Sequence, residues 1–250
     1  MTFFQDAGIA IGAGTLARWL SDHTDIWRDA AVAIQQAGLA SRDWQATDQT
    51  ATRVDWQNET CHVLGTPFFT VYHTRPSGTR QDVLAVLWGQ EPVFRLNADA
   101  LAWLEASNIR RALIGQLCHL LPWERDLTAA ALTSSLRAAG IALGPQQQQQ
   151  VWDAVAIAAY HAQTSVPIVR QLLSDDAAVY HLLTDAHALC WVHDGRHYAK
   201  LSPVAPEHQR QLAAFRKDYW DYYRNLVAYR AAPSANAAER LRVEFATLVA

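Results

Sequence analysis

The chain has 250 residues, of which half are hydrophobic and 18% are charged, and its formal net charge is −3. This composition is typical of a folded globular protein and excludes an intrinsically disordered one. The apolar runs are shorter than the roughly 18 residues that a membrane-spanning helix needs. Three widely spaced cysteines indicate neither a disulfide framework nor a zinc knuckle. Because the N-terminus also lacks a basic leader, we expect a cytoplasmic protein without a membrane span.

Residues 1–40 have the composition of an N-terminal helical segment. Thr15 can cap a turn that runs through Leu16 to Leu20, and apolar residues recur at helical spacing between Asp25 and Ala37. We expect this segment to pack on a sheet.

Residues 43–75 are rich in Thr, Val, Phe and Tyr and are interrupted by short polar stretches. The pattern predicts antiparallel strands over 44–54, 61–65 and 68–73, with a turn near 55–59. Asp48 falls inside the first of these strands. A charge in a half-buried strand is costly unless it is paired or bound to a metal. The alternative is that Asp48 lies on a polar face and points to water.

The following stretch turns from strand to helix. We predict a short helix over 81–88, a brief strand over 93–97, and a helical region over 97–163 that is broken at Gly140, Gly144 and Pro145. The glutamines of 146–150 are interpreted as the exposed first turns of a helix that begins at Pro145. Residues 97–163 therefore form a predicted helical insertion within an α/β fold.

Residues 168–200 contain the strongest functional signal. The apolar run over 168–173 predicts a buried strand, a helix is expected over 177–183, and a second strand over 187–192. Asp175 and Asp176 follow the first strand. Ligands of open α/β sheets bind beyond the carboxyl ends of strands, so Asp175 is a candidate functional residue. The alternative is that one of these aspartates caps the following helix.

The C-terminal part predicts a helical hairpin. Residues 207–230 form an amphipathic helix with an aromatic stripe, and residues 237–249 form a second helix that returns beside it. Such a stripe can stack on nucleic-acid bases, but it is more often a core or a helix-packing surface.

Several separated segments occur together in one protein family. TDQTATRV (47–54), AIAAYHAQT (156–164), SDDAAVYHLL (174–183) and ALCWVHDGRHYAKLSP (188–203) resemble DDE transposases of bacterial insertion sequences, in the insertion-sequence-66-like group. The resemblance implies a ribonuclease H-like mixed sheet with a helical insertion and a C-terminal hairpin. The core would comprise residues 41–96 and 164–205, separated by 97–163, with the helical segment 1–40 before it and the hairpin 206–250 after it.

The resemblance also implies a catalytic site. Asp48 and Asp175 correspond to two catalytic aspartates that bind Mg²⁺ or Mn²⁺, with two ions in a complete enzyme. Gln49 stands where many relatives carry an acid. The expected partner is DNA, both transposon ends and target, and the active family form implies a homo-oligomer. The net charge of −3 argues against tight DNA binding by this chain alone, although a local basic surface is compatible with it.

The segment CWVHDGRHY (190–198) adds weaker candidates. His193 corresponds to a family histidine that contacts DNA or supports the site, and Arg196 and Lys200 can contact phosphates. Cys190, His193 and His197 can also be imagined as zinc ligands, but a fourth ligand is not apparent. A hydrolase built on Cys190 and His193 lacks an orienting acid.

The family's third acid is missing from the sequence. In relatives it is a glutamate in an Asn-Asn-containing stretch beyond the hairpin, and no such stretch precedes Ala250. Glu239 and Glu244 lie within the predicted hairpin and are not candidates. We therefore expect a fragment truncated at both ends. Two hypotheses remain open: a transposase catalytic core, or an inactive remnant that at most binds DNA or another protein.

Overall fold

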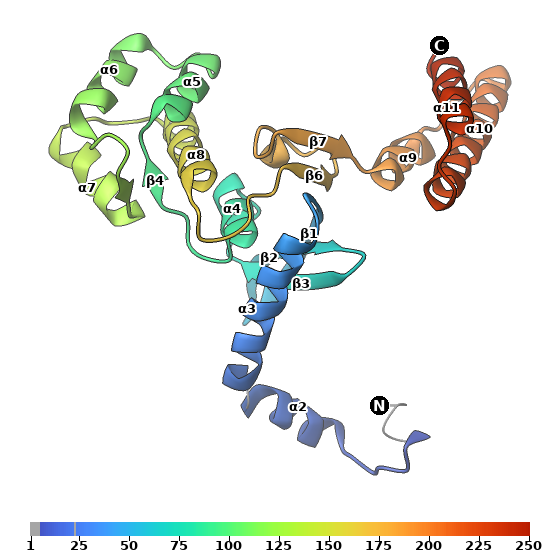
Figure 1. Ribbon diagram of the computed structural model, residues 1–250, viewed down its shortest axis with the longest axis horizontal. Helices are drawn as coiled ribbons and strands as arrows, with labels where there is room; N and C mark the ends of the chain where they lie inside the picture. Colours follow the sequence, from blue (N-terminus) through green and yellow to red (C-terminus); the bar gives the residue numbers. More distant parts are fainter. Residues whose placement is uncertain (1–5, 23) are drawn as a thin grey trace. The chain divides into compact units, whose positions relative to one another are not determined.

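The computed structural model describes residues 6–22 and 24–250, so residues 1–5 and 23 of the predicted N-terminal segment lie outside the described residues (Figure 1). The protein is a mixed α/β protein that divides into two compact units. The first comprises Met1–Leu173 and Ala177–His187, and the second comprises Ser174–Asp176 and Ala188–Ala250. No described helix combines the length and apolar character needed to cross a bilayer.

A five-stranded mixed sheet has the strand order β3-β2-β1-β6-β7. β1 pairs antiparallel with β2 and parallel with β6, and β2 pairs antiparallel with β3. The three antiparallel strands predicted over 44–73 are therefore confirmed. The strands are β1 (Trp44–Val54), β2 (Gln57–Thr66), β3 (Phe69–Arg75), β6 (Gln171–Ser174) and β7 (Ala186–Leu189).

The turn between β1 and β2 is shorter than predicted. Val54 pairs with Gln57, so only Asp55 and Trp56 connect the strands. Both central residues have positive φ, 46° for Asp55 and 67° for Trp56. Positive φ at both positions is the backbone pattern of a type I′ turn, which matches the twist of antiparallel strands. The predicted turn over 55–59 was wrong at its end, because β2 already begins at Gln57.

The N-terminal segment packs on the sheet only at its end. It forms α2 (Ala13–Asp22), in which no residue is buried, and α3 (Thr24–Ser41). Near the end of α3, Gln35 Nε2 donates to the Val86 carbonyl at 2.7 Å. A Cβ on Gly38 would overlap the Phe69 ring, so glycine allows α3 to approach β3 closely.

The predicted helical region is confirmed, and its last helix lies in the core of the first unit. α8 is buried almost continuously from Val151 to Tyr160 and contacts α4, α5 and β4 (Figure 1). Leu64 of β2 and Leu104 of α5 belong to the same buried cluster as Tyr160. The elements are α4 (Arg80–Trp88), β4 (Phe94–Arg95), α5 (Ala98–Ala106), α6 (Arg111–Leu120), β5 (Asp126–Leu127), α7 (Ala129–Ala138) and α8 (Pro145–Ala162).

The helix predicted over 177–183 is not formed. Only a three-residue 3₁₀ turn, η1 (Ala178–Tyr180), occurs there. The Arg80 guanidinium donates to the carbonyls of Ala178 and Val179, and the Ala178 carbonyl also accepts the His181 amide in the i to i+3 pattern of a 3₁₀ turn. Leu182 then adopts a left-handed φ of 64°, which ends any right-handed helix.

The strand predicted over 187–192 was also wrong at its end. β7 stops at Leu189, and α9 (Trp191–Lys200) follows directly. His193, Arg196 and Lys200 therefore lie on a helix that follows the strand. The N-cap residue of α9 is Cys190, whose side chain makes no capping hydrogen bond. The sequence therefore lacks the Ser, Thr, Asp or Asn that usually marks the start of a helix.

The second unit contains α9 and the predicted helical hairpin, α10 (Pro206–Ala231) and α11 (Ala235–Leu248). The aromatic stripe of α10 packs on α9, where Trp191 and Tyr219 stack with ring centroids 4.5 Å apart. The Tyr219 hydroxyl donates to Asp194 Oδ2 at 2.9 Å and also lies 2.7 Å from the Trp191 carbonyl oxygen. The stripe is therefore at least partly a helix-packing surface, as favoured from the sequence.

Candidate functional site

Asp48 lies on the exposed face of β1, opposite Val63 of β2. The preceding residue, Thr47, points inward and donates from its hydroxyl to the Val63 carbonyl at 3.0 Å. Because side chains alternate along a strand, this inward bond places the Asp48 carboxylate on the outer face. The backbone N–H of Gln49 donates to Asp48 Oδ1 at 2.8 Å. An exposed carboxylate suits an open metal site and also suits the solvated alternative.

Gln49, the residue after Asp48, is fitted closely into its surroundings. Its side chain is half-buried, and a Cβ on Gly78 would overlap its Oε1 atom. The side-chain amide of Gln49 therefore packs against the loop that precedes α4. A neutral residue in this confined position avoids the cost of desolvating a second carboxylate beside Asp48.

Asp175 directly follows β6 and is half-buried. The Cys190 amide donates to the Ser174 carbonyl at 2.6 Å, which fixes the backbone at the strand end. The Ser174 hydroxyl donates to the Asp175 carbonyl at 2.8 Å. Ala177 occupies the N-cap position of η1, which has no side-chain cap. The helix that Asp175 or Asp176 was expected to cap is thus not formed, and neither aspartate occupies the N-cap position of η1.

The register of the sheet relates the two strands that carry the aspartates. β1 and β6 are parallel neighbours, with Trp44 opposite Gln171 and Ala46 opposite Leu173. Asp48 comes two residues after Ala46, and Asp175 comes two residues after Leu173. Asp48 belongs to the first compact unit and Asp175 to the second. Within the first unit, the pairing of Ala46 with Leu173 joins two positions that are 127 residues apart in the sequence.

The residues present fit a magnesium site only in part. Carboxylate oxygens are the hard ligands that Mg²⁺ takes, and one or two carboxylates with water satisfy it. Within residues 6–22 and 24–250, His, Cys, Asp and Glu side chains form no group of three that could hold a metal. Glu239 pairs with Arg242, and Glu244 pairs with Arg240 and accepts from Asn225. The described residues therefore offer single carboxylates of the right chemistry but no group of three donors for a metal.

The weaker candidates lie together on α9. His193, Arg196 and Lys200 are separated by three and four residues, which places them along one side of the helix. Arg196, His197 and Lys200 are exposed, whereas His193 is half-buried. The helical placement was missed from the sequence because the apolar residues 188–192 resemble the end of a strand. Cys190, His193 and His197 do not form a three-donor metal group among the described residues.

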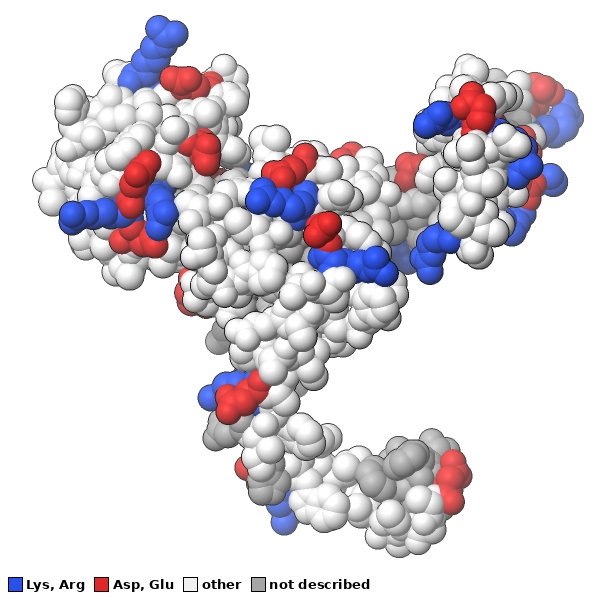
Figure 2. Space-filling view, in the orientation of Figure 1, with Lys and Arg blue, Asp and Glu red and all other residues white. Residues whose placement is uncertain are grey.

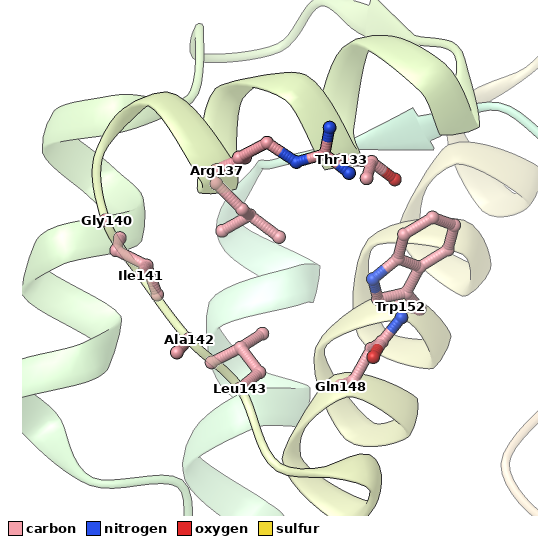
Figure 3. A pocket seen from close by; sticks show the side chains of 9 residues that line it. Thr133, Arg137, Gly140, Ile141, Ala142, Leu143, Gln148 and Trp152 are labelled. Carbon is pink, nitrogen blue, oxygen red and sulfur yellow. The ribbon is translucent and has the colours of Figure 1, made fainter.

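A separate pocket of about 370 Å³ lies between α7, the loop after it and α8 (Figure 3). Its polar groups are Thr133, Arg137, Gln148 and the indole of Trp152, and its remaining wall is apolar. The Trp152 Nε1 atom is buried without a hydrogen-bond partner. No carboxylate lines this pocket, so it does not suit the cation site expected from the sequence.

Comparisons with known proteins give little functional information. No protein-family profile and no solved structure matches the chain. The chain is 26% identical over 220 residues to "Uncharacterized protein y4jO" of Sinorhizobium fredii (strain NBRC 101917 / NGR234). The match covers 85% of this chain and 65% of that protein, so the chain spans less than two thirds of its relative.

Proposed function

We propose that the chain is the catalytic-core portion of a DDE transposase of the insertion-sequence-66-like group. It would cleave and join DNA phosphodiester bonds at Asp48 and Asp175, as a cytoplasmic protein and as a homo-oligomer. The observation that carries this proposal is the parallel pairing of β1 with β6, with an aspartate two residues beyond the last pair on each strand. The order β3-β2-β1-β6-β7 supports a ribonuclease H-like sheet, in which the second catalytic strand lies beside the first.

In this proposal the two aspartates bind a divalent cation. Mg²⁺ or Mn²⁺ would supply an activated water or 3′-hydroxyl and would stabilise the leaving oxygen. The exposed carboxylate of Asp48 leaves room for a DNA phosphate, and the backbone bond from Cys190 to Ser174 holds the strand end that carries Asp175.

A second candidate is an inactive remnant that at most binds DNA or another protein. It is favoured by the lack of a three-donor group among the described residues, because this family uses a third acid. The two candidates differ in one measurable property, metal-dependent cleavage.

The test is nicking of supercoiled plasmid by the purified full chain with Mg²⁺ or Mn²⁺. We expect nicking that Asp48→Asn and Asp175→Asn each abolish. Asp55→Asn, an acid-to-amide change at the exposed tip of the same hairpin, is the matched control and should retain activity. Equal nicking by all four proteins would reject the assigned residues. Binding without nicking by the wild-type chain would favour the remnant.

A further inference from the structure

Charge is distributed unevenly along the chain. Residues 1–187 carry twelve Lys and Arg against eighteen Asp and Glu, a net charge of −6. Residues 188–250 carry nine against six, a net charge of +3. The overall charge of −3 therefore conceals a basic C-terminal stretch, which coincides with most of the second compact unit.

Most cations of the hairpin are already paired. Figure 2 shows basic and acidic side chains interspersed over α10 and α11. Lys217 Nζ lies 2.8 Å from Asp221 Oδ2, and Arg210 pairs with Glu207. Arg224, Arg240 and Arg242 likewise pair with carboxylates of their own helices. Exposed pairs of this kind leave little net field for an anionic partner.

Among the described residues, Arg216 and Arg230 of the hairpin form no ion pair, and in helix α9 both cations are of this kind. Arg196 and Lys200 are exposed one turn apart, and among the described residues neither forms an ion pair. The acid of the same helix, Asp194, accepts a hydrogen bond from Tyr219 of α10. The anionic side chain is thus turned toward α10, while the two cations remain available to solvent.

The contact between α9 and α10 fixes which side of α9 is exposed. Gly195 is buried, and a Cβ there would lie 2.6 Å from Cζ2 of Trp220. Glycine therefore permits close packing at the centre of α9. Together with the stack of Trp191 on Tyr219, this contact presents Arg196 and Lys200 on a preformed surface.

We propose that this α9 surface, defined by Arg196, His197 and Lys200, binds the phosphate backbone of DNA without reading its sequence. The inference rests on the proposed function, since it names the element that holds the DNA. Guanidinium and ammonium groups at adjacent helical turns suit the phosphate oxygens of one strand, and the ring N–H of His197 can donate beside them. The basic C-terminal stretch favours the approach of a polyanion.

The test is binding of a fluorescent DNA duplex by the full chain, measured by anisotropy with Ca²⁺ in place of Mg²⁺ at several salt concentrations. Arg196→Ala with Lys200→Ala should weaken binding and lower the salt slope by about 1.8, at about 0.9 per lost phosphate contact. Arg196→Lys with Lys200→Arg should restore the slope. Arg210→Ala with Lys217→Ala removes the same charge from paired positions and is the matched control.

The outcomes separate this inference from the proposed function. An unchanged slope in the α9 double variant, with binding intact, overturns the inference alone. A slope that the control lowers equally also overturns it, because net charge and not α9 then sets the affinity. Absence of duplex binding by the wild-type chain overturns both proposals. Circular dichroism of each variant verifies that the helices remain folded.

Discussion

Arg80 of α4 donates from Nη1 to Asp153 Oδ2 of α8 at 2.6 Å, and the two side chains are only 14% and 3% exposed. The same guanidinium donates from Nε to the Val179 carbonyl at 3.2 Å and from Nη2 to the Ala178 carbonyl at 2.5 Å. One side chain thus joins α4, α8 and the segment that follows the Asp175 strand end. It holds residues 178 and 179, where a 3₁₀ turn stands in place of the helix expected over 177–183.

Asp153→Asn should destabilise the first unit strongly. Burial raises the pKa of Asp153 and the Arg80 charge offsets this only in part, so the carboxylate depends on its partner. The substitution leaves a buried cation without a counter-charge, a loss of about 3–5 kcal/mol in the free energy of unfolding. Urea denaturation measures it. Asp126→Asn, which breaks the more exposed pair with Arg95, should cost less than about 1 kcal/mol. Similar losses in both variants would contradict the role of burial.

The contribution of Asp82 to stability should depend on pH. Burial alone would raise the pKa of Asp82, but hydrogen bonds from Ser77, Thr79 and Arg75 and the Arg75 charge lower it below the usual value. A lowered pKa in the folded state stabilises the fold above the ordinary aspartate pKa, and this stability is lost as pH falls through the lower folded pKa. Asp82→Asn should therefore be less stable than wild type near neutral pH, with a difference that shrinks in acid. Denaturation at pH 6 and pH 3 measures this change, and a constant difference would count against it.

A glycine in the β1–β2 turn should increase the stability of the fold. Asp55 and Trp56 both adopt positive φ, and Trp56 is 90% exposed, so the ring gains little from packing. Trp56→Gly should raise the free energy of unfolding by up to about 1 kcal/mol, because glycine adopts this conformation without strain. Trp56→Ala also removes the ring but retains the strain, so it should give no such gain. Urea denaturation of both variants distinguishes relief of strain from loss of the exposed ring.

Gly195→Ala should disrupt the packing of α9 on α10. A methyl group would overlap the Trp220 ring and also approach Tyr219 at 3.1 Å, with an expected cost of about 1–3 kcal/mol from overpacking. Thermal unfolding measures the loss. Gly115→Ala in α6 is the matched control, because no atom lies within 4 Å of the added Cβ. If the two variants unfold alike, the close contact at Gly195 does not limit stability.

The parts that the sequence predicts are those with regular apolar periodicity. Such patterns predicted strands β1 to β3, the helices from α4 to α8 and the C-terminal hairpin. They also assigned Asp48 to its strand. The segment 177–192 failed for a different reason. A 3₁₀ turn forms there, and its Ala178 carbonyl also accepts from Arg80, which lies 98 residues earlier. A local sequence pattern does not identify such a distant partner. The register of β1 against β6 is likewise non-local, so the sequence suggested an aspartate at each strand but not their shared offset.

The burial of α8 restricts how this chain can be shortened. The Tyr160 hydroxyl accepts a hydrogen bond from the Val169 amide at 2.9 Å, two residues before β6, and Trp88 Nε1 donates to Ser165 Oγ at 3.1 Å. Tyr160 of α8 therefore holds the segment that leads into β6. A minimal version that removes all of 97–163 loses the Tyr160–Val169 hydrogen bond and the buried residues of α8, whereas one that removes α5 to α7 and retains α8 preserves them. The helical region is only partly dispensable, and the boundary between its dispensable and essential parts falls at Pro145, where α8 begins.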